Sequence, residues 1–177
     1  VFINGFGRIG RSVLRAYLQA PDRWQGLEIA GINDIAAPEM CAYLFEFDSV
    51  FGPWHGAVAL DGAAMVIDGR RIPLHRTPDL STLDLRGVDL VLECTGRAEA
   101  REVAERGLGA GAGRVLISGP SGAADVTVVL GADDDRLQGN GGGMAVAQFA
   151  LRSTKIFAAS VRPSATRVPR TVTISGP

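Results

Sequence analysis

Short apolar runs alternate along the chain with segments whose apolar residues recur every three or four positions. The segments 8–18, 39–47 and 99–107 have this helical spacing, and we expect each to form a helix. Five other runs have the length and apolar content of strands buried in a parallel sheet: 1–4, 27–32, 88–93, 114–118 and 126–130. This alternation predicts an α/β domain with a doubly wound, mostly parallel sheet and helices on both faces.

The stretch 57–75 has a different pattern, in which short runs are separated by turn residues. Asp61-Gly62 and Asp68-Gly69 are dipeptides typical of tight turns, and they flank the runs 64–67 and 71–74. We therefore expect a β-hairpin insertion between the second and third strands of the parallel sheet.

Three glycines, Gly5, Gly7 and Gly10, join the first predicted strand to the first predicted helix. In the dinucleotide-binding motif the first glycine permits a tight turn, the second lets a pyrophosphate approach, and the third lets the helix pack on the strand. The N–H groups near Arg8 and Ile9 lack helical partners and would face the anion. Turn glycines alone would give the same spacing, but the strand before and the helix after favour a Rossmann-type nucleotide site.

An acidic residue, Asp34, follows the second predicted strand, 24 positions after Gly10. A carboxylate at this place can accept hydrogen bonds from the hydroxyls of the adenosine ribose, and each such bond contributes about 1.5–3 kcal/mol. Its charge would repel a 2′-phosphate, so NAD is favoured over NADP. The alternative is a turn or helix cap, because Asn-Asp is also common in turns.

The composition argues against several other classes of protein. The formal net charge is −1, and no apolar run approaches the length of a membrane span, so we expect neither a nucleic-acid nor a membrane partner. No signal peptide is visible, and the two cysteines, Cys41 and Cys94, form no disulfide or zinc framework. We expect a cytoplasmic protein without a metal site.

Six stretches together resemble phosphorylating, NAD-dependent glyceraldehyde-3-phosphate dehydrogenase, in that family's order and spacing. They are 3–11, 32–34, 47–52, 87–96, 110–120 and 125–131. The resemblance covers residues 1–137, which would be the family's NAD-binding Rossmann domain. It implies a glycolytic oxidoreductase in which NAD accepts a hydride from an aldehyde. Erythrose-4-phosphate dehydrogenase is a close alternative, although the stretches 32–34 and 47–49 favour the triose enzyme.

The resemblance also implies roles for single residues in binding NAD. Asp34 would hold the adenosine ribose, Arg76 would lie beside the adenine through its backbone, and Ser118 would approach the nicotinamide. The pyrophosphate turn would comprise Asn4, Gly5, Phe6, Gly7, Arg8, Ile9 and Gly10, and Thr95 and Gly96 would pass under the cofactor. Ala98 departs from the family, which has an aromatic residue there; the loss of this stacking surface would weaken binding by about 1 kcal/mol.

The resemblance ends after Leu137, where the family continues with Ser-Asn-Ala-Ser-Cys-Thr-Thr-Asn and its nucleophilic cysteine. We expect no catalytic residue in this chain, because Cys41 and Cys94 are predicted to be inert core residues and neither His55 nor His75 has a spacing that pairs it with them. The sequence is interpreted as a family member truncated or frame-disrupted before the nucleophile.

Residues 138–177 are expected to be an unrelated Gly/Arg/Ala-rich tail that is poorly ordered. All acidic residues lie at or before Asp135, whereas 136–177 contain five arginines and Lys155. This tail is too sparse in aromatic residues for a nucleic-acid patch. Two alternatives to a damaged enzyme remain open: a non-enzymatic NAD-binding module, and a subunit that forms homo- or hetero-oligomers with intact family members.

Overall fold

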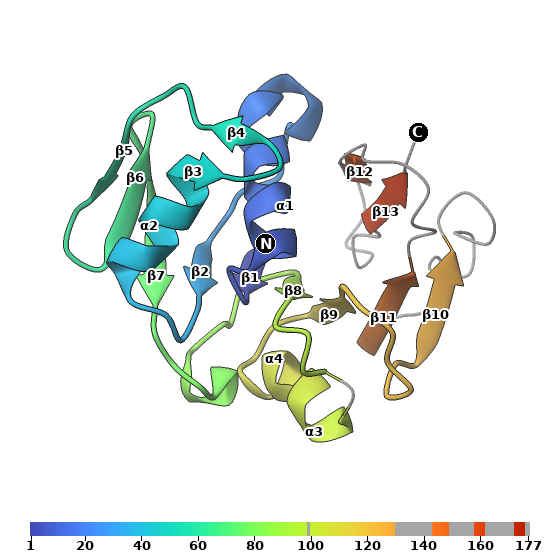
Figure 1. Cartoon of the computed structure of the whole chain (residues 1–177). Helices are drawn as coiled ribbons and strands as arrows, with labels where there is room; N and C mark the ends of the chain where they lie inside the picture. The colour runs from blue at the N-terminus through green and yellow to red at the C-terminus, as the bar shows by residue number, and fades with distance from the viewer. Residues whose placement is uncertain (99, 130–142, 149–157, 162–171, 176–177) are drawn as a thin grey trace.

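A computed structural model describes residues 1–98, 100–129, 143–148, 158–161 and 172–175. Within these ranges the chain forms a nine-stranded sheet with helices packed on it (Figure 1). The strands are β1 (Phe2–Asn4), β2 (Gly31–Asn33), β5 (Val58–Leu60), β6 (Ala64–Ile67), β7 (Arg70–His75), β8 (Val91–Glu93), β9 (Arg114–Ile117), β10 (Val126–Val129) and β11 (Gly143–Gln148). The predicted α/β fold class is confirmed.

Strand β1 lies in the middle of the sheet and pairs in parallel with β2 on one side and β8 on the other. The pairing sets Asn4 opposite both Asn33 and Glu93. From β1 the chain moves outward to β2 and β7, and then returns to β8 and β9 on the opposite side. The order therefore reverses between β1 and β8, and a crevice forms at the carboxyl ends of the strands at such a reversal.

The expected hairpin insertion is present. Strands β5, β6 and β7 pair as an antiparallel meander, and β7 also pairs in parallel with β2, which joins the hairpins to the main sheet. Asp68 adopts φ +49° and Gly69 φ +80°, which is the left-handed geometry that a two-residue turn requires. A second antiparallel pair, β3 (Phe47–Asp48) with β4 (Gly52–Pro53), follows helix α2.

Helices α1 (Arg8–Gln19) and α2 (Pro38–Glu46) form where apolar spacing predicts them, and a 3₁₀ turn, η1 (Pro21–Trp24), follows α1. The helix expected over 99–107 differs. The structure has two short helices, α3 (Arg101–Ala104) and α4 (Arg106–Gly109), and residue 99 lies outside the described residues. Gly107 explains the close fit of α4, because an added Cβ would lie 2.8 Å from the Val115 side chain of β9. Another 3₁₀ turn, η2 (Leu80–Thr82), precedes β8.

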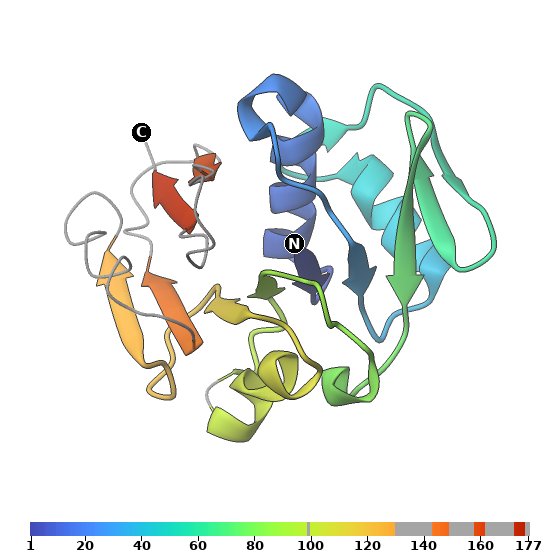
Figure 2. The same ribbon diagram turned by 180° about the vertical axis from the view of Figure 1, so that it is seen from behind.

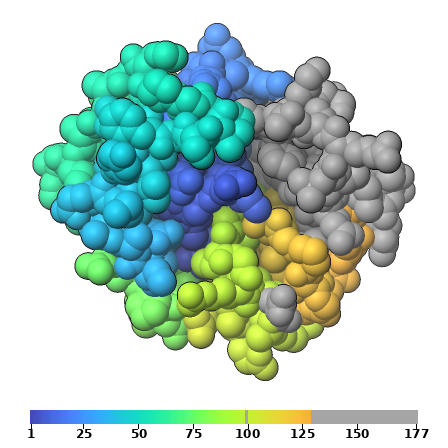
Figure 3. All heavy atoms as spheres, viewed as in Figure 1, coloured from blue at the N-terminus to red at the C-terminus, as the bar shows by residue number. Residues whose placement is uncertain are grey.

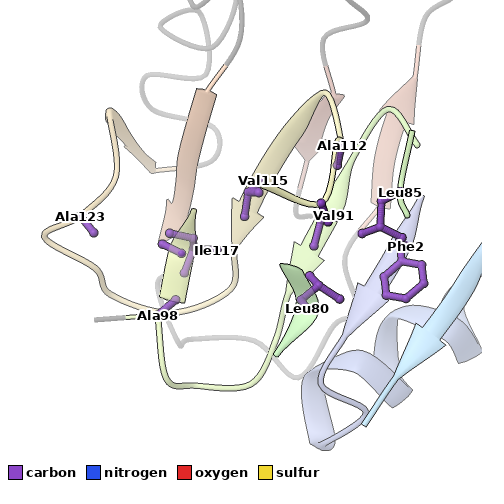
Figure 4. Close-up of a cluster of buried hydrophobic side chains, with 11 residues drawn as sticks. Phe2, Leu80, Leu85, Val91, Ala98, Ala112, Val115, Ile117 and Ala123 are labelled. Atoms are coloured by element: carbon purple, nitrogen blue, oxygen red, sulfur yellow. The ribbon is translucent and has the colours of Figure 1, made fainter. Parts of the chain in front are cut away.

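The two faces of the sheet carry different cores, because successive side chains of a strand point to opposite faces. Phe2 belongs to one core and Ile3 to the other. The core of Phe2 includes five buried alanines, several of them visible in Figure 4. The core of Ile3 is made of larger side chains such as Phe6, Phe45 and Met65, and it lies against α1 and α2. Helices thus cover both faces, as Figure 2 shows from behind.

A buried charged group, the arginine cluster of Arg11, Arg15 and Asp48, joins α1 to the segment around β3. Arg15 is 2% exposed and donates to the carbonyl oxygens of Phe45, Glu46 and Gly52, while its guanidinium lies over the Phe45 ring. Burial opposes the charges of Arg15 and Asp48. The pKa of Arg15 is lowered, whereas backbone N–H donors and both arginines hold the pKa of Asp48 below its ordinary value.

Strands from the last forty residues also occur within the described ranges. Strand β11 lies between β9 and β10 and pairs with both in parallel, and β12 (Ala158–Val161) pairs with β13 (Val172–Ser175) in an antiparallel ladder. A strand of the main sheet, β11, therefore follows the domain boundary predicted at residue 137. The boundary itself, and the poor order expected of the tail, stay predictions, since most of 138–177 lies outside the described residues.

Candidate functional site

A cleft of about 350 Å³ lies at the carboxyl ends of β1, β2 and β8, where the strand order reverses. Five of the residues predicted from the sequence line it together: Asn4, Gly5, Gly7, Asp34 and Thr95. In Figure 3 the dark-blue start of the chain is visible between the cyan and yellow-green segments that flank it. The cleft therefore has the position at which doubly wound sheets bind ligands.

The glycine turn has the close contacts that its sequence predicts. Gly5 adopts φ +93°, and a Cβ added there would lie 2.6 Å from the backbone nitrogen of Thr95. A Cβ on Gly10 would lie 2.3 Å from the Gly5 carbonyl oxygen, so this glycine allows α1 to begin against the turn. Gly7 has open space where its Cβ would stand, which leaves room for a ligand to approach the backbone. Gly5 and Gly10 thus have a steric reason to be glycine within the protein, whereas a Cβ on Gly7 would meet only the open space of the site.

Asp34 connects the end of β2 to the glycine turn. Its Oδ2 accepts a hydrogen bond of 2.6 Å from the backbone N–H of Phe6, and its Oδ1 accepts one of 2.9 Å from Ala36. The second bond is the turn cap considered as an alternative in the sequence. Each carboxylate oxygen can accept two hydrogen bonds, so these contacts leave acceptor capacity for a ligand in the cleft. Asp34 can therefore stabilise the turn and bind a ligand at the same time.

A series of hydrogen bonds, here called the amide ladder, crosses the floor of the cleft through Glu93, Asn4, Asn33, Thr77 and Thr95. Asn4 Nδ2 donates to Glu93 Oε2 at 2.5 Å, and Asn33 Nδ2 donates to Asn4 Oδ1 at 2.8 Å. Asn33 also donates to the Thr77 carbonyl and accepts from the Thr77 N–H. At the other end, Glu93 Oε1 accepts from both the N–H and the hydroxyl of Thr95.

Sequence reasoning missed Glu93, Asn33 and Thr77 as site residues, and it also missed Arg97 and Arg106, which line the cleft. A polar residue at the end of an apolar strand was the available signal for Glu93 and Asn33. Ala98, where the family's stacking residue is expected, is 4% exposed and belongs to the core. The cleft wall at this point is formed by Arg97 instead.

The remaining predicted residues lie around the cleft without lining it. Phe6 is 2% exposed and its ring stacks on Phe45 in the core. Arg8 and Ile9 are exposed at the start of α1. Gly96 adopts φ +72° in the turn after β8.

Arg76 and Ser118 occupy the two sides of this region. Arg76 Nε donates to the Ile35 carbonyl oxygen at 3.0 Å, beside Asp34 in the chain. The Ser118 N–H donates to the Glu93 carbonyl oxygen at 3.0 Å, and its side chain is hydrogen-bonded to the Cys94 thiol. Whether the predicted residues touch a cofactor stays a prediction.

Neither thiol has the properties of a nucleophile. Burial raises the pKa of Cys94 to about 12 and that of Cys41 to about 11, so both remain protonated at neutral pH. Within the described residues, no group of three or more His, Cys, Asp and Glu side chains is placed to hold a metal ion. In the same part of the chain, no helix is long and apolar enough to cross a bilayer.

Comparisons with known proteins agree with this geometry. The sequence model of "Glyceraldehyde 3-phosphate dehydrogenase, NAD binding domain" matches residues 1–101. The glyceraldehyde-3-phosphate dehydrogenase of Zymomonas mobilis is 45% identical over 149 residues, covering 79% of this chain and 44% of the relative. The enzyme of Geobacillus stearothermophilus is 41% identical over 138 residues, with 77% and 40% covered. The chain spans less than half the length of these curated relatives.

Proposed function

The chain belongs to the glyceraldehyde-3-phosphate dehydrogenase family and holds its NAD-binding domain, and on this premise we propose that NAD lies in the cleft at the ends of β1, β2 and β8. One observation carries the proposal. The Asp34 carboxylate and the glycine turn meet at one cleft, joined by the bond from Phe6 N–H. An acceptor for ribose hydroxyls is thereby placed beside a turn suited to a pyrophosphate.

The charges of the site support the same orientation of the cofactor. The start of α1 carries free N–H groups and about half a positive charge from the helix dipole, and Arg8 is exposed there. We place the pyrophosphate over this turn and the adenosine ribose at Asp34. Arg76 would then lie beside the adenine, Thr95 and Gly96 would pass under the cofactor, and Ser118 would lie at the nicotinamide end.

The aldehyde oxidation that the family name implies needs an activated thiolate, which the two cysteines of this chain do not supply. Both thiols are buried with a raised pKa. We propose that this chain supplies the hydride-acceptor platform of a glycolytic oxidoreductase and does not oxidise an aldehyde by itself. Two free thiols fit a cytoplasmic location.

Association with further subunits is a second proposal, and exposed apolar side chains favour it. Met40 and Tyr43 lie on α2, Phe47 follows directly at the start of β3, and each of the three is at least half exposed. Adjacent large apolar groups of this kind are typical of a surface that another chain covers. Sedimentation of the chain alone and together with an intact relative tests this, and a single monomer under both conditions would count against it.

The cofactor proposal is tested by calorimetric titration with NAD and NADP. We expect saturable NAD binding and much weaker NADP binding, since the charge of Asp34 repels a 2′-phosphate. Asp34→Asn should weaken NAD binding about tenfold, because a charged acceptor is lost, and should reduce the preference for NAD. Asp22→Asn removes an exposed carboxylate in η1 and is the matched control. Absence of binding at millimolar NAD would overturn the proposal.

A further inference from the structure

Glu93 is a buried carboxylate for which the proposed function provides no role. It is 3% exposed, and within the described ranges it forms no ion pair. Its partners are neutral donors: the Asn4 amide and the N–H and hydroxyl of Thr95. A buried charge without a counter-ion is stabilised only where such donors are well placed. Asn4 and Thr95 both line the cleft, whereas Glu93 lies behind them.

The far end of the amide ladder allows the Asn33 side chain only one orientation. The backbone N–H of Thr77 donates to Asn33 Oδ1 at 2.9 Å, and its carbonyl accepts from Asn33 Nδ2 at 3.0 Å. Backbone groups cannot exchange the roles of donor and acceptor, so the Asn33 amide cannot flip. Because Asn33 Nδ2 also donates to Asn4, the Asn4 oxygen must face Asn33. The Asn4 Nδ2 must therefore face Glu93.

The near end of the ladder is oriented by Glu93, because an ionised carboxylate only accepts hydrogen bonds. Glu93 Oε2 takes one of the two Asn4 N–H groups, and within the described residues the other has no protein partner. Glu93 Oε1 takes the hydroxyl proton of Thr95, so the Thr95 oxygen offers only lone pairs to other groups, and one of them accepts the Arg97 N–H at 3.2 Å. Asn4 is left with a donor and Thr95 with an acceptor.

We infer that Glu93 is a positioning residue of the dinucleotide site: it accepts from the Asn4 amide that Asn33 turns toward it and it sets the direction of the Thr95 hydroxyl, so that a donor of Asn4 and an acceptor of Thr95 are presented to the bound cofactor. The inference rests on the proposed function, since it assumes that NAD occupies this cleft. A donor and an acceptor along one cleft suit a ligand whose hydroxyls both donate and accept, which is the chemistry of a ribose. Glu93 itself touches no ligand and acts through its two neighbours.

Replacement of Glu93 by glutamine would remove this control while preserving the shape of the side chain. Glutamine has one acceptor oxygen and one donor amide. If its oxygen faces Thr95, the amide opposes the Asn4 N–H; if it is reversed, the amide opposes the Thr95 N–H. Asn4 cannot flip to relieve the first arrangement, because Asn33 is held by Thr77. One donor of the site therefore loses its acceptor in either case.

The test compares NAD binding to the full chain with Glu93→Gln and with Glu102→Gln. Glu102 is exposed on α3 and has no hydrogen bond within the described residues, so it controls for the loss of one carboxylate. At a temperature well below unfolding, we expect Glu93→Gln to raise the Kd for NAD about tenfold, whereas Glu102→Gln leaves it unchanged. A purely structural role would lower the Tm of Glu93→Gln but leave the Kd of the folded protein unaltered, and that result would overturn the inference.

A second measurement uses the unmutated chain and covers the case in which Glu93→Gln does not fold. Addition of NAD should shift the ¹⁵N–¹H resonances of the Asn4 side-chain amide and the Thr95 N–H, while the Gln19 side chain stays unchanged. Absence of any shift at Asn4 and Thr95 in a protein that binds NAD would overturn the inference about Glu93 and leave the proposed function standing. If the unmutated chain binds no NAD, the proposed function fails and this inference fails with it.

Discussion

Arg15 and Glu93 are both buried charged side chains, at 2% and 3% exposure, and yet their surroundings differ in kind. Arg15 donates to three backbone carbonyls and lies over an aromatic ring. Glu93 accepts from groups that line the cleft. Burial of a charge is therefore not by itself a sign of function. The informative difference is whether its partners also face a ligand.

The partners of the two groups also differ in their freedom. The carbonyl oxygens of Phe45, Glu46 and Gly52 belong to the backbone around β3 and β4. A backbone carbonyl oxygen only accepts hydrogen bonds, so its role does not depend on how neighbouring side chains are oriented. The arginine cluster can therefore only hold α1 against that segment. In the amide ladder, by contrast, removal of the Glu93 carboxylate leaves the Asn4 amide without its acceptor and lets the Thr95 hydroxyl rotate, and both of these groups line the cleft that a ligand meets. We therefore expect substitution of Arg15 to lower the stability of the fold without changing NAD affinity, and substitution of Glu93 to weaken NAD binding in the folded protein.

The largest effect on stability is expected at Arg15. Arg15→Met keeps much of the side-chain volume but leaves three carbonyls without their donor, so the free energy of unfolding should fall by about 3 kcal/mol. NAD affinity of the folded protein should not change, because Arg15 lies outside the cleft. Urea unfolding and titration of the same sample measure both quantities. If Arg15→Met raised the Kd for NAD as well as lowering the free energy of unfolding, the arginine cluster and the amide ladder would not differ in the way described.

A smaller effect on stability, joined to loss of binding, is expected at Gly5. Gly5→Ala places a Cβ 2.6 Å from Thr95 N and adds the strain of φ +93°, so we expect about 2 kcal/mol of destabilisation and strongly weakened NAD binding. Gly26→Ala is the control, because Gly26 has φ +81° with nothing within 4 Å. It should cost about 1 kcal/mol and leave NAD affinity intact. Equal effects of the two variants on binding would show that the contact with Thr95 has no importance.

The smallest effect concerns Asp48 and depends on pH. Its pKa in the folded protein is below the ordinary value of 3.8, so its ionisation stabilises the fold above about pH 4 and this contribution is lost as the pH falls through the folded pKa. Asp48→Asn should lower the free energy of unfolding by about 1 kcal/mol at pH 7, with the difference vanishing in strong acid. Unfolding curves between pH 2 and pH 7 measure this. A difference independent of pH would exclude a charge effect in the arginine cluster.

The parts of the molecule that the sequence predicted well depend on local geometry. The glycine turn, α1 and the hairpins each follow from spacing within a few residues, and the position of Asp34 follows from the end of the second strand, 24 residues after Gly10. The amide ladder could not be predicted in this way, because it depends on the register that sets Asn4 beside Asn33 and Glu93. The split of α3 from α4 and the burial of Ala98 also depend on packing against the sheet, which local spacing does not report.

The bond between Asn4 and Glu93 joins residues 89 positions apart. The cleft is therefore complete only when β1, β2 and β8 have paired. The unfolded chain contains no part of the binding site. A dinucleotide that binds only to the folded protein must stabilise the folded sheet as a whole by thermodynamic linkage. At a free concentration one hundred times the Kd, this amounts to about 2.7 kcal/mol. The cofactor level in the surroundings would then govern how much of this chain is folded at any moment.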